Sequence, residues 1–408
     1  MTAREYPVFT VTPKAERSLR AGHPWVYGEE VTAVEGAYQN GDMVDVVSNK
    51  GRYLGTGWVN DHSKIRVRII SHNANDTFDE AFFRRRVCYA LNYRKTVMGP
   101  VDYRCCRLIF GEADQFPGLT VDRFENILVT QVLSLGMERR KDWVYRALVE
   151  LLREDGEQID AIYERNDVTI RTLEGLEQGK GFYQMEWLRT DLSGHVTITE
   201  NGIKYDVDYI EGQKTGFFLD QKYNRQAAAK LARGRRVLDC FTHTGAFALN
   251  AAAAGAEHVT AVDVSAFALE LAAENGKRNG LTNLDYKCAD VFDLLTEMAK
   301  EKKCDYDYII LDPPAFTKSR ATAKNAYHGY KEINRKAMRL LPRGGYLATC
   351  SCSHFMTDEM FRKMLREAAL DAGVTLRQIE ARQQAPDHPI LPGVPETDYL
   401  KFYLLQVV

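Results

Sequence analysis

The segment from Asp312 to Phe316 places an acid, two prolines and an aromatic side chain directly after a predicted buried strand. Pro313 and Pro314 fix an extended backbone and remove two hydrogen-bond donors. Such a turn can position the Asp312 carboxylate at the edge of a sheet. There it could accept a hydrogen bond from an amino group on a planar base. The alternative interpretation is a rigid strand exit with no chemical role.

A second candidate group is the thiol of Cys352, which stands between Ser351 and Ser353 at the end of another predicted strand. A thiolate is a strong nucleophile. Cys350 faces the same side of that strand but lies deeper, where cysteine is often a small buried hydrophobe. We therefore predict that Cys352 is the nucleophile, with core packing as the alternative. The His and Cys spacings do not match a metal site, so none is predicted.

A third group of residues indicates a nucleoside cofactor. The turn after the strand at 236–240 has one glycine, Gly245, where a dinucleotide fingerprint would have three, which disfavours NAD and FAD. Asp263 ends the next strand, 24 residues after Asp239, close to the spacing of an acid that grips a ribose. Ribose without pyrophosphate suggests S-adenosylmethionine. Helix capping by Asp263, with Ser265 as a competing cap, stays open.

Strands and helices alternate from about residue 222 onward, which predicts a doubly wound parallel sheet with its ligand site at the carboxyl ends of the strands. Asp290 follows the strand at 284–288. There it could accept a hydrogen bond from an adenine amino group, or it could cap the helix from Val291. The other predicted strands are 236–240, 258–263, 306–312 and 345–352, the helices are 244–256, 266–278, 330–341 and 358–372, and the tail 399–408 could add a last strand.

The first half of the chain has a different pattern. Residues 6–72 are short β-like runs, which predict a small all-β module, and a helix is expected at 79–97. Strands and a helix mix as far as residue 183, and Asn201-Gly202 predicts the tip of a β-hairpin. We expect three domains: residues 1–75, a central α+β domain at 76–190, and the doubly wound α/β domain at 191–408.

Composition excludes several classes of protein. The chain has 408 residues, 45% of them hydrophobic and 27% charged, and a net charge of −2. These values fit a globular protein. The net charge does not indicate a polyanion partner, although a local basic face could exist. No apolar run approaches a membrane span. Eight cysteines without a disulfide-like spacing predict free thiols and a cytoplasmic location.

These motifs together resemble the RlmI-like family of class I S-adenosylmethionine-dependent rRNA methyltransferases, which make 5-methylcytosine in large-subunit rRNA. The resemblance covers essentially the whole chain, including an N-terminal PUA-like RNA-binding barrel, and the collinear set of motifs is highly specific. The matching segments are Arg20–Val26, Gly111–Asp122, Lys214–Arg225, Cys240–Gly245, Asp312–Phe316 and Ser351–Ser353.

The resemblance implies an enzyme that binds S-adenosylmethionine and rRNA, with Cys352 as nucleophile and Asp312 holding the base. An aromatic residue directly after the prolines is typical of amino-methylating enzymes, but Ala315 stands there, which argues against simple N-methylation. The expected cofactor residues are Gln221, Asp239, Phe241, Thr242, Thr244, Gly245, Asp263, Val264, Asp290, Val291 and Asp312, and the expected substrate residues are Pro313, Pro314, Phe316, Arg20 and Arg66.

Several alternatives stay open. The chain could methylate another base position, act as a non-catalytic RNA-binding assembly factor, or methylate a small molecule or a protein. Arg17, Lys64 and Arg68 could also meet phosphates, whereas Trp25 is interpreted as a core aromatic. The sequence does not decide the target nucleotide, the group that removes the carbon 5 proton, or the oligomeric state, for which a homodimer is one option.

Overall fold

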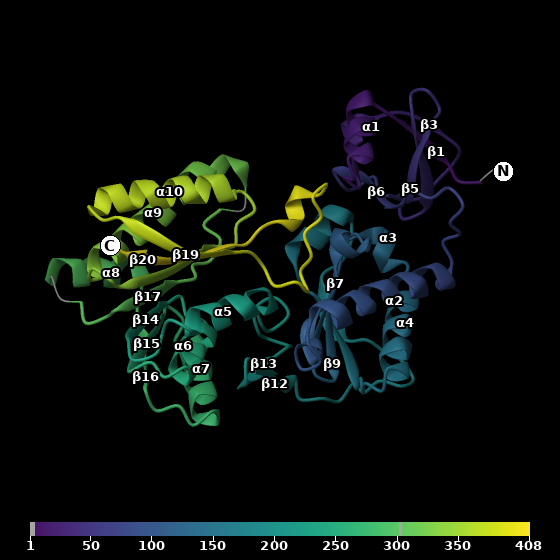
Figure 1. Cartoon of the computed structure of the whole chain (residues 1–408). Helices are drawn as coiled ribbons and strands as arrows, with labels where there is room; N and C mark the ends of the chain where they lie inside the picture. The colour runs from purple at the N-terminus through teal and green to yellow at the C-terminus, as the bar shows by residue number, and fades with distance from the viewer. Residues whose placement is uncertain (1–4, 302–303, 318) are drawn as a thin grey trace. The chain divides into compact units, whose positions relative to one another are not determined.

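The computed structural model describes residues 5–301, 304–317 and 319–408. It divides into two compact units, which are described separately (Figure 1). The first contains residues 1–198, 207–219 and 386–397, and the second contains residues 199–206, 220–385 and 398–408. The expected boundaries at residues 75 and 190 stay a prediction.

The N-terminal part of the first unit is a six-stranded sheet around a small core. The strand order is β2-β6-β5-β4-β1-β3, and the helix α1 packs its buried Ala15 and Leu19 into the core of the sheet. The expectation of a small β module is confirmed, but the module also contains one short helix, because Thr12 and Pro13 start a helix between two strands. The bounds are β1 Val8–Val11, α1 Pro13–Arg20, β2 Trp25–Tyr27, β3 Val31–Glu35, β4 Met43–Ser48, β5 Tyr53–Val59 and β6 Ile65–Ser71.

The same unit contains a second sheet, of five strands in the order β11-β10-β9-β8-β7. The helix expected at 79–97 is α2, which Asp79 caps and which packs against α4. The bounds are α2 Glu80–Val97, β7 Cys105–Phe110, β8 Leu119–Phe124, β9 Ile127–Val132, α3 Leu135–Glu138, α4 Lys141–Glu154, β10 Ala161–Asn166 and β11 Gly179–Phe182.

The second unit is built on a seven-stranded sheet in the order β16-β15-β14-β17-β18-β20-β19. The strands β14 to β18 are mutually parallel, whereas β20 is antiparallel to both of its neighbours. The chain end thus returns between two earlier elements, a long-range pairing that the local pattern of apolar residues did not reveal. The bounds are β14 Arg236–Cys240, β15 His258–Asp263, β16 Leu284–Cys288, β17 Tyr308–Leu311, β18 Tyr346–Ser351, β19 Leu376–Arg382 and β20 Lys401–Val407.

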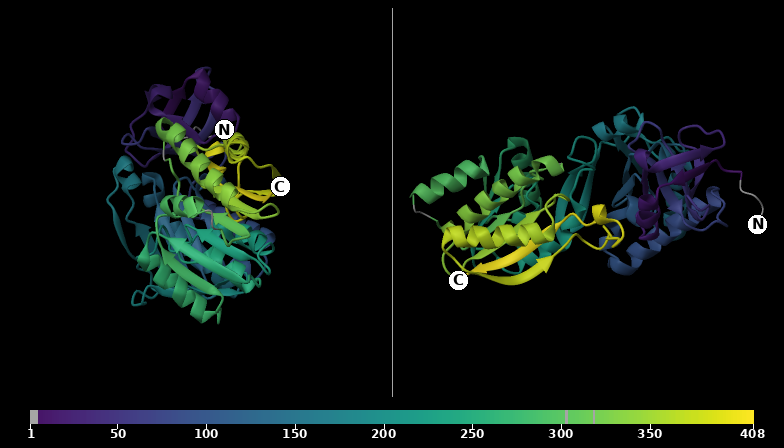
Figure 2. Two further views of the ribbon diagram at one scale, coloured as in Figure 1. Left: turned by 90° about the vertical axis from the view of Figure 1, so that its left-hand side faces the viewer. Right: turned by 90° about the horizontal axis from the view of Figure 1, so that it is seen from above.

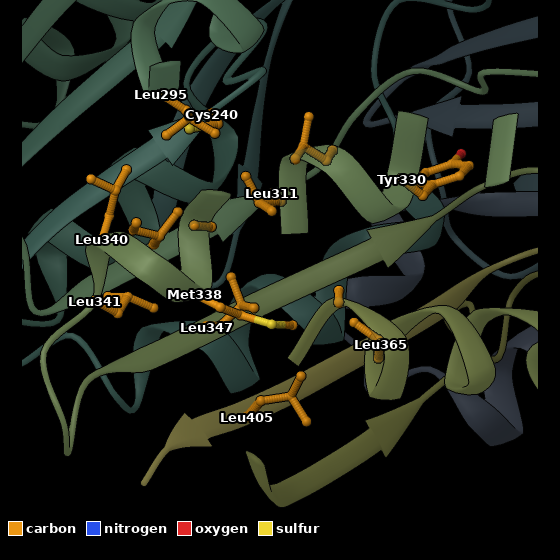
Figure 3. Close-up of a cluster of buried hydrophobic side chains, with 14 of the residues drawn as sticks. Cys240, Leu295, Leu311, Tyr330, Met338, Leu340, Leu341, Leu347, Leu365 and Leu405 are labelled. Atoms are coloured by element: carbon orange, nitrogen blue, oxygen red, sulfur yellow. The ribbon is translucent and has the colours of Figure 1, made fainter. Parts of the chain in front are cut away.

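Helices cover both faces of this sheet, as the alternating pattern predicts. The helices α8, α9 and α10 bury one face, where Leu311, Leu347 and Tyr330 belong to the cluster drawn in Figure 3. The helices α5 and α6 bury the other face, and Figure 2 shows both layers from two further sides. The bounds are α5 Lys222–Ala229, α6 Ala246–Ala253, α7 Ala266–Arg278, α8 Val291–Glu301, α9 Ala323–Leu340 and α10 Asp358–Ala372. The helix α9 starts seven residues before the predicted residue 330.

The predicted hairpin is confirmed as β12 (His195–Glu200) and β13 (Ile203–Asp208), with Asn201 and Gly202 at positive φ in the turn. Glu200 at the tip forms a fully buried, bidentate ion pair with Arg225 of α5, at 2.6 and 2.7 Å. Because a buried charge is stable only when it is paired, this contact fixes α5 on the hairpin. It therefore also fixes Gln221, the residue just before α5.

In the described part of the chain, every helix is too short or too polar to cross a lipid bilayer. All eight cysteines are free thiols, as the sequence predicts.

Candidate active site

The carboxyl ends of four parallel strands bring the predicted acids and thiols to one edge of the seven-stranded sheet. Asp239 lies in β14, Asp263 ends β15, Asp312 follows β17, and Cys352 follows β18. The strand order places β17 beside both β14 and β18. A doubly wound sheet binds its ligands at this edge. The structure thus brings together residues that are 113 positions apart in the sequence, from 239 to 352.

The loop between β14 and α6 has an unusual backbone. Phe241 and His243 have φ values of 63° and 51°, and Gly245 has a φ of 85°. A Cβ atom at Gly245 would lie 2.7 Å from Leu249 and 3.0 Å from Ala272, so only glycine fits. Non-glycine residues in the left-handed region cost about 1–3 kcal/mol each and cluster at ligand sites. This strained loop is therefore a candidate cradle for a cofactor, and the sequence pattern did not reveal the strain.

Asp263 ties this loop to the next strand. Its carboxylate accepts hydrogen bonds from the backbone N–H groups of His243 and Ser265, both at 2.9 Å. The cap of α7 is Ser265, whose hydroxyl accepts from the N–H of Ala268. The alternative that Asp263 is the helix cap is therefore wrong. The carboxylate lies at the loop between β14 and α6, where it could accept hydrogen bonds from the hydroxyl groups of a ribose.

Asp239 is a fully buried acid below the same loop. One of its carboxylate oxygens, Oδ2, accepts a hydrogen bond from the Thr242 hydroxyl at 2.6 Å. The other, Oδ1, has no hydrogen-bond partner among the described residues. Burial, together with the nearby charge of Asp312, raises the pKa of Asp239 to about 7, although the Thr242 hydrogen bond opposes this rise. A buried acid with an unsatisfied oxygen suits a positively charged ligand, and S-adenosylmethionine carries a sulfonium charge.

Asp312 is held by two side chains. The Gln221 amide donates to Asp312 Oδ1 at 3.1 Å, and the Cys350 thiol donates to the same oxygen at 2.9 Å. The Gln221 carbonyl in turn accepts from Asn224 at 2.7 Å. Burial raises the pKa of Asp312, and these two hydrogen bonds oppose that rise. The carboxylate is therefore fixed in orientation at the strand end.

The two cysteines have different environments. Cys350 is 1% exposed, and burial together with the Asp312 charge raises the pKa of its thiol well above the ordinary value. The register pairs Leu311 with Thr349, so Asp312 is level with Cys350, and Cys352 lies two residues further out. Cys352 is half-buried and directly follows the last residue of β18. The prediction that Cys350 is the deeper, packed residue is confirmed.

The remaining expected site residues lie around this edge with varied exposure. Asp290 accepts from the N–H groups of Phe292 and Asp293, so it caps α8. Val291 is buried in the core, whereas Val264 is 73% exposed. Phe316 packs against Tyr330, with ring centroids 4.5 Å apart. Of the others, Thr242, Thr244 and Pro313 are buried and Pro314 is exposed.

The basic residues expected to bind RNA lie in the first unit. Arg20 is exposed, with a loose ion pair to Glu16 at 3.7 Å, and Lys64 is also exposed. Arg66 forms an ion pair with Asp61. Arg68 is buried against Glu174, so its expected phosphate contact was wrong.

Other side chains of this unit are also engaged in internal contacts. Trp25 donates its indole N–H to Glu112 at 3.0 Å, in keeping with a structural aromatic. The guanidinium groups of Arg84 and Arg85 form ion pairs with acids of the same unit. In the described ranges, no cluster of three or more His, Cys, Asp or Glu side chains could hold a metal ion.

The second unit has the fold of an S-adenosylmethionine-dependent methyltransferase. A family model described by that name matches residues 151–404, and a PUA-like domain model matches residues 9–72. The cofactor is S-adenosylmethionine.

Curated relatives extend this match to the whole chain. "Ribosomal RNA large subunit methyltransferase I" of Pseudoalteromonas atlantica is 40% identical over 98% of this chain and 99% of its own length. The protein of the same name from Shewanella denitrificans is 42% identical over 97% and 98%. The chain belongs to the family of these methyltransferases.

Solved structures agree on the fold. A putative methyltransferase from Streptococcus mutans matches with a TM-score of 0.81 at 22% identity, covering 98% of this chain and 100% of its own. A second putative methyltransferase, complexed with SAH, matches with a TM-score of 0.82 at 22% identity over the same shares.

Proposed function

We propose that this protein methylates carbon 5 of a cytosine in large-subunit rRNA through a covalent adduct with Cys352. The observation that carries the proposal is the pair of groups at one sheet edge, a half-buried thiol just beyond β18 and a carboxylate fixed just beyond β17. The names of the relatives support rRNA as substrate. An rRNA substrate agrees with the cytoplasmic location that the sequence predicts.

The proposed chemistry explains why a thiol is needed. Carbon 5 of cytosine is not nucleophilic in the aromatic ring. The Cys352 thiolate forms a bond to carbon 6, which makes carbon 5 enamine-like. S-adenosylmethionine, when bound, would supply the methyl group to carbon 5 and leave as S-adenosylhomocysteine. A base then removes the carbon 5 proton, and the bond between carbon 6 and the Cys352 sulfur breaks.

Asp312 would hold the cytosine ring in this scheme. Gln221 and Cys350 donate to only one of its oxygens, Oδ1. The other oxygen could accept from the ring's amino group, and Pro313 and Pro314 would keep it at that position. We further propose that the loop Phe241–Gly245, Asp239 and Asp263 hold the cofactor. The part that Asp290, Val264, Val291 and Phe316 take in binding stays a prediction.

The test of this function identifies the methylated nucleoside. The protein is incubated with S-adenosylmethionine labelled in its methyl group and with large-subunit rRNA from a strain that lacks the gene. The RNA is then digested to nucleosides. We expect the label in 5-methylcytidine. Label in another nucleoside would contradict the base assignment, and label in a protein or small molecule alone would contradict the rRNA substrate.

Replacing Asp263 with alanine should weaken S-adenosylmethionine binding about ten- to a hundredfold, the value of a hydrogen bond to a charged group. Isothermal titration calorimetry measures the affinity. The matched control is Ser265→Ala, which removes the cap of α7 and should cost roughly 1 kcal/mol of stability without changing the affinity. Equal affinities in the wild type, Asp263→Ala and Ser265→Ala would show that Asp263 has only a structural role.

Cofactor affinity should rise with pH. Because burial holds the pKa of Asp239 near 7, its carboxyl is mostly neutral at pH 6 and mostly charged at pH 8. A positively charged ligand prefers the charged form, so binding releases a proton, and affinity should be about tenfold lower at pH 6 than at pH 8. Calorimetry across this range measures the change. The Asp239→Asn variant should lose this dependence, and a wild-type profile as flat as that of Asp239→Asn would show that Asp239 does not contact the cofactor charge.

RNA binding should weaken when exposed basic residues of the PUA-like part are reversed in charge. Arg20→Glu with Lys64→Glu should lower rRNA affinity and leave cofactor affinity unchanged. The slope of log affinity against log salt should become shallower by roughly 0.7–0.9 for each lost phosphate contact. Filter binding at several salt concentrations measures both effects. An unchanged affinity and slope would place the RNA surface elsewhere.

A further inference from the structure

Lys401 is a buried cation beside the strand that carries the two cysteines. It is the first residue of β20, it pairs with Ser351 across the antiparallel register, and it is 4% exposed. Its ammonium group donates to the carbonyl oxygen of Ser353 at 2.7 Å and to that of Tyr399 at 2.8 Å. The first of these contacts joins Lys401 to the residue that directly follows Cys352.

Both hydrogen-bond acceptors are neutral carbonyl groups, so they do not neutralise the ammonium charge. A buried cation is costly unless a negative charge lies near it. Burial accordingly lowers the pKa of Lys401 to about 8, and four groups oppose that effect: Asp398, Cys352, Asp358 and Cys350. His354 and Tyr399 are the other titratable groups on the adjoining loops.

The four opposing groups are placed differently around Lys401. Asp398 accepts from the Gln383 amide at 3.3 Å. Asp358 is half-exposed and bonds to Tyr403 and Arg362. The thiol of Cys350 donates a hydrogen bond to Asp312, and burial favours its neutral form. Cys352 directly precedes Ser353, whose carbonyl oxygen Lys401 binds, and its side chain is half-buried. This position makes the Cys352 thiolate the group best suited to be the counter-charge of Lys401.

We propose that Lys401 is a positioning residue for Cys352, whose thiolate it stabilises and whose backbone it fixes through the Ser353 carbonyl. This inference rests on the proposed role of Cys352 as nucleophile and adds the residue that prepares it for attack. In the free protein the proton leaves Cys352 for solvent while Lys401 stays protonated, so the ion pair forms before RNA arrives. No co-reactant is required.

The experiment measures the rate at which iodoacetamide alkylates Cys352 as a function of pH. The full-length protein is used without cofactor or RNA, and mass spectrometry of the peptides follows each cysteine separately. The exposed Cys288 in the same chain is the internal reference. Because only the thiolate reacts, the pH midpoint of the rate reports the ionisation of each thiol, independently of how exposed it is.

In the wild-type protein, the midpoint of Cys352 should lie below that of Cys288. Lys401→Met should raise the Cys352 midpoint by about one pH unit, which is about a tenfold lower rate at pH 7, and should leave Cys288 unchanged. Lys401→Arg keeps the charge and should keep a midpoint closer to wild type than Lys401→Met does. A Cys352 midpoint that is the same in wild type and Lys401→Met would overturn the proposal.

If Lys401→Met does not fold, the wild-type comparison decides, and a Cys352 midpoint at or above that of Cys288 overturns the proposal. The measurement uses neither RNA nor methyl transfer, so its failure is distinct from failure of the proposed function. A shifted midpoint in a protein that makes no 5-methylcytidine would support the Lys401 contact and contradict the function. An unshifted midpoint in a protein that makes 5-methylcytidine would support the function and contradict the proposed role of Lys401.

Discussion

Replacing Cys352 with alanine should lower methyl transfer to rRNA by at least about a thousandfold, because removal of a covalent nucleophile leaves only binding and orientation. Binding of S-adenosylmethionine should be unchanged, since the proposed cofactor residues lie on the β14 and β15 side of the site. Cys352 is half-buried and is not one of the residues of the two hydrophobic clusters that cover this sheet, so we expect a folded variant. Methyl incorporation and calorimetry measure the two effects.

The matched control is Cys350→Ser. Serine keeps a donor for Asp312 Oδ1, so the hydrogen bond that orients the carboxylate survives. We expect this variant to retain most of its activity. Substantial methylation by Cys352→Ala would contradict the covalent mechanism and point to an exocyclic nitrogen as the target. If activity is lost in Cys350→Ser and kept in Cys352→Ala, then Cys350 is the nucleophile and Cys352 is not.

The candidate site could be located from the sequence because its residues stand at the ends of buried strands. Asp263, Asp312 and Cys352 each end or follow an apolar run, and parallel strands bring such ends to one edge. The strand bounds at 236–240, 258–263 and 284–288 are those of the structure. In this part of the fold, local pattern and tertiary position agree.

The contacts within the site could not be predicted, because they join distant elements. The bond from Gln221 to Asp312 spans 91 positions, and the ion pair of Glu200 with Arg225 joins a hairpin to a helix. Lys401 reaches the Cys352 loop only because β20 inserts between β18 and β19. Its burial was not apparent from the sequence, because lysine is usually exposed.

The contacts of the basic residues in the PUA-like part also could not be predicted from the sequence. The alternation from Lys64 to Arg68 predicts a half-exposed strand with its charges outward, and β6 does form there. Arg68 instead lies 2.5 Å from Glu174, a residue 106 positions away. An alternating pattern gives the period of a strand, but it does not tell which face another element covers.

The covalent step can be trapped with a substrate that cannot complete the reaction. A cytosine with fluorine at carbon 5 has no proton to lose after methyl transfer, so the bond between Cys352 and carbon 6 should persist. RNA carrying 5-fluorocytosine at the target should therefore remain attached to nearly all of the enzyme that has turned over once. Lys401→Met should form this adduct more slowly at pH 7, since its thiol ionises less.

The most direct test of the account is denaturing electrophoresis of the protein after incubation with S-adenosylmethionine and 5-fluorocytosine RNA, followed by mass spectrometry of the linked peptide. We expect a shifted band that requires the cofactor, carries the RNA on Cys352, and disappears in Cys352→Ala while persisting in Cys350→Ser. A protein that methylates unmodified rRNA at cytosine but forms no cofactor-dependent adduct, or that forms one on another residue, would contradict the proposed role of Cys352.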